Sequence, residues 1–468
     1  MTTRRQLLQS IAVTGAMMPL EASAHPRQPE NPWVEADRIV ARIKRSRFAD
    51  RDFKITDFGA VGDGTTKCTE AFAKTVAACA LSGGGRVVVP DGVWLTGAIH
   101  LKSNVNLVVS RGATVRFSTD PKDYLPLVLT RWEGVECMNY SPLIYAFEAE
   151  NVAVTGSGTL DGQASDVFWW PWKGKGEFGW RSGTPDQAEA RKKLFAMGDA
   201  DTPVADRVFG EGSYLRPNFF EPYRCKNVLI EGVTLRNAPF WEVHPVLCTS
   251  VTVRGLTIDS AGPNTDGCDP ECCKDVLIEG CSFNTGDDCI AIKSGRNGDG
   301  RRVAVPSENI VIRGCTMKNG HGGVTIGSEI SGGVHNVFAE NCRMDSPDLG
   351  NAIRIKNNAK RGGNLGNFHF RHIVVGQVEH AVLTIDFNYE EGANGPFKAV
   401  LKGVHLSSIV SGKSKFGIDA QGLPNATVED VTLDACEFNN VADGNIIKYV
   451  RGVRFRGLKI NGKPVTAP

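Results

Sequence analysis

Neither sign of charge predominates in this sequence of 468 residues, which has 53 lysines and arginines against 52 aspartates and glutamates. No block of like charge stands out, so nothing indicates a nucleic-acid partner or a membrane surface. Beyond the first two dozen residues, no apolar run approaches the about 20 residues that span a bilayer. The thirteen cysteines lack the CxxC…CxxC spacing of a zinc site, and most lie in apolar, strand-like runs. We expect most of them to be buried thiols.

The first 24 residues have the features of an export signal. Thr3-Arg4-Arg5-Gln6-Leu7-Leu8-Gln9 resembles a twin-arginine motif, and a weakly apolar run follows from Ile11 to Leu20. Ala22-Ser23-Ala24 is a small-residue cleavage pattern. We therefore expect a twin-arginine-type signal peptide over 1–24, a mature chain that starts near His25, and export to the periplasm or the medium.

From residue 225 onward the chain repeats itself. Short motifs with the pattern apolar-x-apolar recur at steps of 23 to 34 residues and begin at Val233, Leu256, Cys281, Cys315, Cys342, Ile373, Val404, Val431 and Leu458. Each unit has a turn with Gly or Asn and a second strand such as Ile290-Ala291-Ile292, without a helical pattern between the strands. Short strands at this period stack best as an all-β, parallel β-helix. Cys281, Cys315 and Cys342 would form a ladder inside it.

Three segments lie outside this repeat. Residues 25–50 form an N-terminal extension with a helical pattern, and a helix over 69–80 would cover one end of the solenoid, where strand edges are otherwise unpaired. Residues 163–218 interrupt the rhythm and carry four of the eight tryptophans. A long insertion on one coil usually builds a binding face, with a dimer contact or a poorly ordered loop as the alternative. The β-helix itself is expected to span 51–468.

Chemically active side chains recur just before or within the second strand of four adjacent units. They are Asp266, Asp287, Asp288, His321, Arg354 and Lys356. Because matching positions of stacked coils lie about 4.8 Å apart, these side chains should share one face. Carboxylates that flank a cleft with room for a water are the equipment of glycoside hydrolysis. Arginine and lysine beside them suit a substrate that carries carboxylates of its own.

Four motifs in this region resemble the signatures of glycoside hydrolase family 28, the polygalacturonases. They are Asn264-Thr265-Asp266, Gly286-Asp287-Asp288, Gly320-His321-Gly322 and Arg354-Ile355-Lys356. They come in the family's order with compatible spacing, and the resemblance extends over roughly 53–460. It implies a single right-handed parallel β-helix of the pectin-lyase-like type. It also implies inverting hydrolysis of α-1,4-linked galacturonic acid in pectic polymers or oligomers, without a metal or cofactor.

The resemblance further implies roles for the motif residues. Asp287 resembles the general acid, and Asp266 and Asp288 resemble the pair that activates water. His321 would lie beside the acid and hold its protonation state. The residues expected to bind the substrate are Asn264, Arg354, Lys356 and, outside any tight motif, Tyr389. Residue spacing by itself leaves open which aspartate is the acid.

Four more residues are candidates from their position. His244 precedes Asp266 by one coil on the expected face, with a structural role between Val243 and Pro245 as an equal alternative. Arg296, Arg301 and Arg302 lie in the segment that stretches one repeat to 34 residues. There they would contact neighbouring uronates of the substrate. The default interpretation of this segment is a solvated charged loop.

Several other functions share parts of this pattern. A pectate lyase would hold calcium in a carboxylate cage, which a histidine and two cations beside the acids disfavour. A non-catalytic carbohydrate-binding β-helix would not need every motif residue. An endo-polygalacturonase and a rhamnogalacturonan or xylogalacturonan hydrolase stay open. We expect a monomer that cleaves from chain ends, because the insertion and the segment 296–302 flank the catalytic face and would wall its groove. Short oligomers also reach the periplasm more readily than long pectin.

Overall fold

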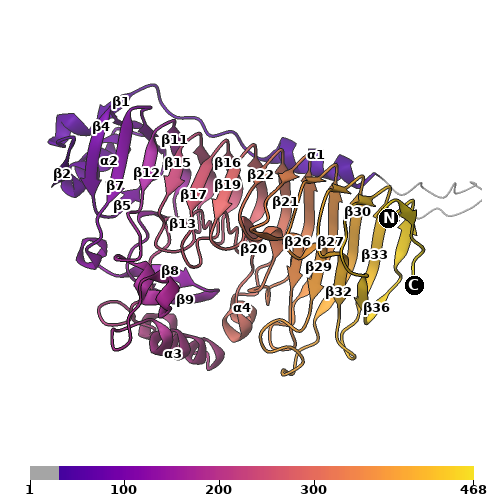
Figure 1. Ribbon diagram of the computed structural model, residues 1–468. Coiled ribbons are helices and arrows are strands. Elements are labelled where there is room, and N and C mark those ends of the chain that lie inside the picture. The colour runs from indigo at the N-terminus through magenta and orange to yellow at the C-terminus, as the bar shows by residue number, and fades with distance from the viewer. Residues whose placement is uncertain (1–30) are drawn as a thin grey trace, which may run out of the picture.

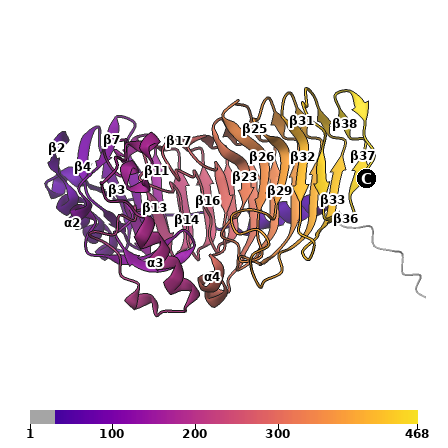
Figure 2. The same cartoon turned by 60° about the horizontal axis from the view of Figure 1, so that its bottom comes forward.

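The computed structural model describes residues 31–468, most of which wind into a single parallel β-helix (Figure 1, Figure 2). Two 14-stranded sheets run along the solenoid, and a six-stranded sheet closes the coils of its C-terminal half. The expected signal peptide at 1–24 lies outside the described residues. No helix among residues 31–468 is long and apolar enough to cross a membrane.

The first long sheet contains, in order, β1 (Asp52–Lys54), β3 (Gly85–Val89), β6 (Val105–Val109), β11 (Glu150–Gly156), β14 (Lys226–Glu231), β16 (Thr249–Arg254), β18 (Lys274–Glu279), β21 (Ser307–Arg313), β24 (Val334–Glu340), β27 (Asn364–Arg371), β30 (Val400–Ser407), β33 (Val428–Asp434) and β36 (Val450–Arg451), with β37 (Arg454–Arg456) also on β33. The second contains β2 (Asp63–Lys67), β4 (Gly92–Thr96), β7 (Ala113–Phe117), β12 (Thr159–Asp161), β15 (Thr234–Arg236), β17 (Thr257–Ser260), β19 (Ser282–Thr285), β22 (Thr316–Met317), β25 (Arg343–Met344), β28 (Val374–Val375), β31 (Val410–Ser411), β34 (Glu437–Phe438), β38 (Lys459–Ile460) and β39 (Lys463–Pro464).

The third sheet carries the face on which the candidate site lies. It contains β20 (Ile290–Ile292), β23 (Gly320–Ile326), β26 (Leu349–Lys356), β29 (Ala381–Asp386), β32 (Phe416–Gln421) and β35 (Ile446–Lys448). A shorter sheet takes its place in the N-terminal half and contains β5 (Ile99–Leu101), β10 (Ile144–Phe147) and β13 (Phe220–Tyr223).

The core is a set of apolar columns inside the solenoid. The strands of the first long sheet alternate, so that Val276 and Ile278 point inward and stack on Ile310 and Ile312 of the next coil. Such β-branched side chains favour the pleated conformation and pack well between coils. The predicted ladder is confirmed, because Cys281, Cys315 and Cys342 are buried in the main core and each directly precedes one of three paired strands, β19, β22 and β25. All thirteen cysteines lie within residues 31–468 as buried free thiols.

The repeat register was wrong at two of the nine predicted positions. Val404 and Val431 pair with each other in the first long sheet, on β30 and β33. In the second sheet, Val374 pairs with Val410 and Ser411 pairs with Phe438, so the equivalent positions begin at Ile409 and Cys436. The strands of both sheets alternate apolar residues in the same way, and an apolar-x-apolar motif therefore does not distinguish them.

Two helices cover parts of the solenoid. As predicted, α2 (Thr69–Leu81) lies at its N-terminal end, where Phe72 and Val76 are buried in the main core. The other helix, α1 (Pro32–Arg42), runs across the outside of the first long sheet near β21 (Figure 1). Its buried residues Trp33 and Ile39 join the cluster with Leu277, Val311 and Phe338, apolar residues that point out of the solenoid.

The insertion and a hairpin form a lobe beside the sheets. The insertion follows β12 and contains three short 3-10 helices, η3 (Trp170–Lys173), η4 (Gly176–Phe178) and η5 (Val204–Asp206), and α3 (Ala188–Asp199). The hairpin consists of β8 (Val128–Trp132) and β9 (Val135–Asn139), which the sequence did not reveal. Trp132 and Leu194 lie together in the apolar cluster of this lobe. Two further 3-10 helices, η1 (Ile55–Phe58) and η2 (Pro121–Tyr124), lie outside the insertion. The remaining helix, α4, is described with the site.

The packing of α1 predicts that Ile39→Ala loosens the N-terminal extension. Truncating a fully buried isoleucine costs about 2–4 kcal/mol, and the cost falls on the docking of one helix. We expect trypsin to cut the segment 42–47 at least about tenfold faster in this variant, because the helix opens locally more often. Val34→Ala, at a more exposed position of the same helix, is the control. Equal cleavage rates in the two variants would contradict the proposed docking.

Candidate active site

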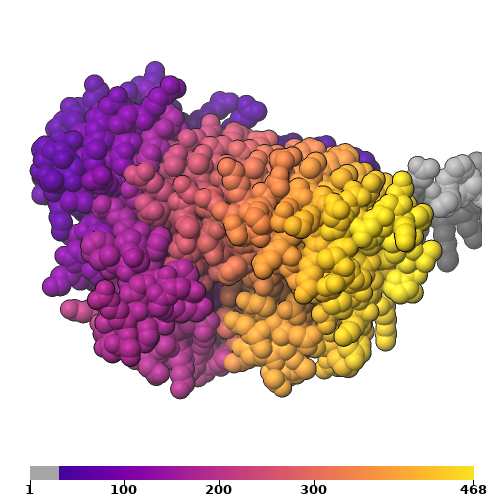
Figure 3. Space-filling view, in the orientation of Figure 1, coloured from indigo at the N-terminus to yellow at the C-terminus, as the bar shows by residue number. Residues whose placement is uncertain are grey.

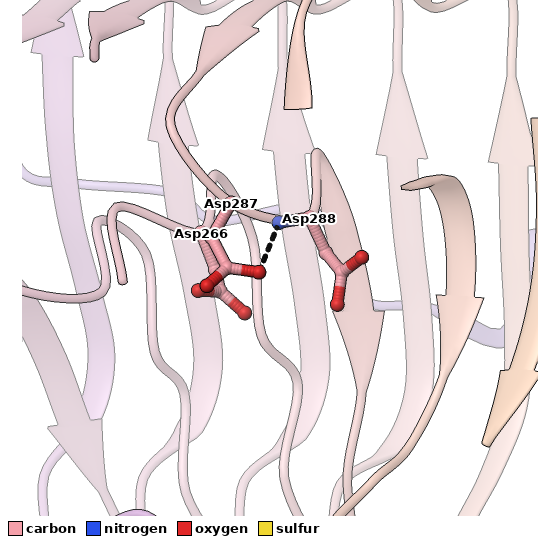
Figure 4. A group of neighbouring side chains, drawn as sticks. All are labelled: Asp266, Asp287 and Asp288. Atoms are coloured by element: carbon pink, nitrogen blue, oxygen red, sulfur yellow. Dashed lines mark hydrogen bonds between the residues drawn. The ribbon is translucent and has the colours of Figure 1, made fainter. Parts of the chain in front are cut away.

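Three aspartates converge at the start of the third sheet (Figure 4). Asp266 follows β17, and Asp287 and Asp288 connect β19 to β20. Each offers one oxygen atom, and the three atoms lie within 4.8 Å of one another. The backbone N–H of Asp288 donates to Oδ1 of Asp287 at 2.9 Å, the dashed line in Figure 4. The predicted convergence of acids on adjacent coils therefore occurs.

Close packing of two turns brings the carboxylates together. Gly286 lies so near the preceding coil that a Cβ atom there would be 2.1 Å from the carbonyl oxygen of Gly262. Its N–H donates to Oγ1 of Thr265 at 3.1 Å, and Oγ1 of Thr285 donates to the carbonyl of Asp287 at 2.8 Å. Any larger residue at 286 would push the Asp287 turn away from the turn that carries Asp266.

Asp288 is held in an ion pair beneath the cavity surface. Lys356 Nζ lies 2.7 Å from its Oδ2, Thr325 Oγ1 donates to its Oδ1 at 2.9 Å, and Arg354 Nη1 lies 3.6 Å from Oδ1. The Lys356 side chain is only 6% exposed, and its nearest ion-pair partner is the carboxylate of Asp288. Arg354 is more exposed and faces Tyr389, whose ring centroid is 5.6 Å from Cζ.

A second lysine, Lys293, binds the other side of the acidic cluster. Its Nζ lies 3.4 Å from Oδ2 of Asp266, 3.6 Å from Oδ2 of Asp269 and 3.3 Å from Oε2 of Glu329. The same ammonium group lies 4.3 Å from the ring centroid of Trp241, a cation–π contact. Lys293 and its three carboxylate partners are buried. This one cation therefore balances part of the charge of three acids.

Burial and neighbouring charges shift the pKa values of Asp266 and Asp287 in opposite directions. Burial, followed by the charge of Asp287, raises the pKa of Asp266 to about 7. For Asp287, burial would raise the pKa, but the hydrogen bond and charge of His321 outweigh it and hold the pKa below the ordinary value. In the unliganded site, Asp266 therefore retains a proton below about pH 7, and Asp287 is ionised.

His321 pairs with Asp287 at the mouth of the site. Its Nδ1 lies 2.9 Å from Oδ1 of Asp287, and the ring is 61% exposed. The hydrogen bond to Asp287 and the charge of that carboxylate raise the pKa of His321. Of the three aspartates, Asp287 has the most exposed side chain, at 18%. It is therefore the carboxyl group best placed to reach a ligand.

The carboxylate cluster opens into a cavity of about 340 Å³. In Figure 3 a hollow separates the magenta insertion from the orange segment that follows β29. Eight of the predicted site residues line the cavity: Asn264, Asp266, Asp287, Asp288, His321, Arg354, Lys356 and Tyr389. The cavity thus gathers all four motifs.

The four remaining candidates do not line this cavity. His244 is fully buried beneath Trp241, and its Nε2 lies 2.8 Å from Oε2 of Glu271. The segment expected to be a solvated loop instead begins with buried Arg296 and folds into α4 (Asn297–Val303). Arg296 pairs with Glu329 and Glu390. Arg301 stacks on Phe397, and Arg302 pairs with Glu136 and Asp299.

Sequence reasoning missed several residues that line the cavity. They are Glu133, Lys173, Arg191, Trp241, Lys293, Ser328, Glu329 and Glu390. The sequence did contain a signal for Lys293, because it follows Ile292 as Lys356 follows Ile355. The structure pairs Ile292 with Ile326 and Ile326 with Ile355, so the two lysines occupy the same position two coils apart. Glu133, Lys173 and Arg191 belong to the hairpin and the insertion, where no repeat marks a position.

The same three aspartates are the described group best able to hold a metal ion. Carboxylate oxygens are ligands that calcium and magnesium prefer. However, Lys356 already contacts Asp288, and Lys293 already lies beside Asp266. A divalent cation would have to displace or repel these ammonium groups, so the donor set fits acid/base chemistry better than a metal cage.

The fold and the site together define a parallel β-helix with a cluster of carboxylates in a surface cavity. A sequence model of the glycosyl hydrolases family 28 matches residues 210–421. A probable polygalacturonase from Vitis vinifera is 30% identical over 83% of this chain and 74% of that protein. An exo-poly-α-D-galacturonosidase from Dickeya chrysanthemi is 28% identical over 72% of this chain and 57% of that protein.

Among solved structures, a hyperthermoactive exopolygalacturonase from Thermotoga maritima is 44% identical, with a TM-score of 0.90. The match covers 92% of this chain and 96% of that one. The chain belongs to glycosyl hydrolases family 28. It is a glycoside hydrolase, and its sheets match the right-handed β-helix of the Thermotoga enzyme.

The position of Lys293 predicts a pH-dependent loss of stability in Lys293→Met. At pH 8, above the raised pKa of Asp266, the variant buries Asp266, Asp269 and Glu329 without their shared cation. We expect the free energy of unfolding to fall by about 3–5 kcal/mol at pH 8, measured in urea.

The loss in Lys293→Met should shrink at pH 4. Burial raises the pKa of both Asp266 and Asp269 above the ordinary value. At pH 4 both carboxyl groups therefore hold a proton, and removing Lys293 no longer leaves their charges unbalanced. Lys192→Met, on the exposed side of α3, is the control. An equal loss at both pH values would contradict the charge argument.

Proposed function

We propose that this enzyme hydrolyses α-1,4-linked galacturonan from chain ends and releases galacturonic acid. The observation that carries the proposal is an acid/base cluster inside a walled cavity that also holds cations. Arg354 is 3.6 Å from its nearest carboxylate, and Lys173 donates to Oδ1 of Asn264 at 2.8 Å. Among residues 31–468, no carboxylate is within ion-pair distance of Lys173. These two cations suit the carboxylates of a uronate.

The walls of the cavity support cleavage from chain ends. The hairpin turn at Glu133–Gly134 meets the segment after β20, where the N–H of Arg296 donates to the carbonyl of Gly134 at 2.9 Å. On the insertion, Lys173 and Arg191 line the same cavity. A closed groove admits the end of a chain and excludes its interior. Similarity to the Dickeya and Thermotoga exo-acting enzymes supports the same mode.

In the proposed mechanism, the carboxylates exchange protonation states when the substrate binds. A proton that Asp266 holds in the free site passes to Asp287, across the short distance within the cluster and by way of a water. Asp287 then protonates the leaving glycosidic oxygen as the bond to C1 breaks. The ionised Asp266, with Asp288 beside it, takes a proton from the water that attacks C1. Lys293 and Lys356 hold these two carboxylates in place.

The proposal includes inversion at C1, which the family motifs imply. Inverting glycosidases usually hold their two carboxyl groups about 6.5–9.5 Å apart, and retaining ones about 5–5.5 Å apart. Here the nearest oxygens of the aspartates are within 4.8 Å. This closest-atom distance is shorter than the separation of the carboxyl groups to which the rule refers, so the anomer of the first product is the test of inversion.

Product analysis on polygalacturonate and oligogalacturonides tests the whole proposal. We expect galacturonic acid as the first product, as the β anomer by ¹H NMR, with viscosity falling slowly in proportion to the reducing ends. Removing divalent cations with EDTA should have no effect. A steep early loss of viscosity would indicate internal cuts and an open groove. Ultraviolet absorbance from unsaturated ends that requires calcium would indicate a lyase.

A pair of variants tests the assignment of the acid. Asp287→Asn should lower kcat on trigalacturonate by about 10²–10⁴-fold, because the leaving oxygen is no longer protonated. On an aryl galacturonide with an acidic phenol, which leaves without protonation, the same variant should retain most of its activity. Asp266→Asn should be impaired on both substrates. Asp345→Asn, at a more exposed position, is the control. If Asp266→Asn were rescued and Asp287→Asn were not, the two roles would be reversed.

A further inference from the structure

Glu133 occupies a position in the cavity wall that neither the motifs nor the repeat explains. It forms, with Gly134, the two-residue turn between β8 and β9, where Trp132 pairs with Val135. Both turn residues have positive φ, 41° for Glu133 and 81° for Gly134. Asparagine, aspartate or glycine suits the first position of such a turn, and a glutamate there is strained. Turn formation alone therefore does not explain a glutamate at this position.

The Glu133 side chain is buried but faces the catalytic cavity. The residue is 5% exposed and lines the same cavity as the three aspartates. Arg191 of α3 clasps it with two contacts, Nε at 2.8 Å and Nη2 at 2.7 Å, both to Oε2. The Oε1 atom is not engaged by that guanidinium. Burial would raise the pKa of Glu133, but the charge of Arg191 outweighs it and lowers the pKa, so the group is an ionised acceptor.

The surrounding contacts fix this carboxylate in place. A Cβ atom on Gly134 would lie 2.7 Å from the backbone nitrogen of Arg296 and 2.8 Å from Cγ of Glu329, so the hairpin tip is packed tightly against the catalytic coils. Glu329 is itself bound by Lys293 and Arg296. An anchored, ionised acceptor on the wall of a substrate cavity is suited to bind a hydroxyl group.

We propose that Glu133 selects chain ends by accepting a hydrogen bond from the free 4-hydroxyl group of the terminal galacturonate. The inference rests on the proposed function. In the interior of a galacturonan chain, that oxygen is glycosidic and has no hydrogen to donate. A carboxylate facing it would then be left without its partner, and the next sugar would collide with the hairpin. Both effects reject internal segments, so Glu133 acts as a specificity residue.

The test compares two trimers that differ at the non-reducing end. One is trigalacturonate, and the other is the 4,5-unsaturated trimer, which has no hydroxyl group at C4. We expect the wild type to prefer trigalacturonate in kcat/KM. Glu133→Gln should lower kcat/KM for trigalacturonate by about tenfold, because a neutral carboxamide oxygen is a weaker acceptor than a carboxylate. The value for the unsaturated trimer should change little, so the preference collapses.

Two controls separate this role from a structural one. Glu189→Gln changes an exposed acid of the same insertion and should leave both values unchanged. In the unmodified enzyme, inhibition by galacturonate should be about 10- to 100-fold stronger than inhibition by its 4-deoxy analogue, a comparison that does not depend on folding of a variant.

Each outcome has a distinct meaning. An equal loss on both trimers in Glu133→Gln, or equal inhibition by the two monosaccharides, would overturn the inference and leave Glu133 as an anchor for α3. A wild type that does not hydrolyse trigalacturonate would instead overturn the proposed function. The two failures are therefore distinguishable.

Discussion

The spacing of hydrogen-bonded parallel strands determines what this molecule can do. Successive coils lie about 4.8 Å apart, so residues at one position of the repeat become neighbours although 20 to 35 residues separate them. Asp266 and Asp288 meet in this way, and so do Asp287 and His321. The columns of buried apolar side chains that hold the coils together also hold these groups at a fixed distance. A cluster of acids beside a histidine thus follows from the same stacking that forms the core.

Such close acids are stable only because cations come from the same coils. Bringing three carboxylates within 4.8 Å raises the free energy of the fully ionised state, and burial raises it further. Lys293 and Lys356, two coils apart in register, lie on opposite sides of the cluster and offset part of that charge. The two lysines do not offset burial and the neighbouring negative charges completely, so the pKa of Asp266 stays above its ordinary value. The stability of the coil and the pKa of Asp266 therefore depend on the same lysines.

The walls of the cavity are built differently from its floor. The hairpin β8–β9 and α3 are held by a buried apolar cluster of their own and by ion pairs such as Arg191 with Glu133. Their tip reaches the catalytic coils through the backbone contact between Gly134 and Arg296. The solenoid thus carries the cluster of acids, whereas an appended lobe supplies part of the cavity wall above it. In the proposed function, this lobe limits which part of a polymer reaches the acids.

The sequence alone determined the parallel β-helix, the cysteine ladder and the face shared by Asp266, Asp287 and His321, because a repeat converts spacing along the chain into distance in space. It misplaced Val404 and Val431, since strands of both long sheets alternate alike, and it offered no signal for Glu133, which lies in a turn outside the repeat. Only the tertiary structure decided which of the acids holds a proton and that Lys356 binds Asp288. Those properties depend on burial and on the summed charges of several coils, and no local pattern of residues encodes such a sum.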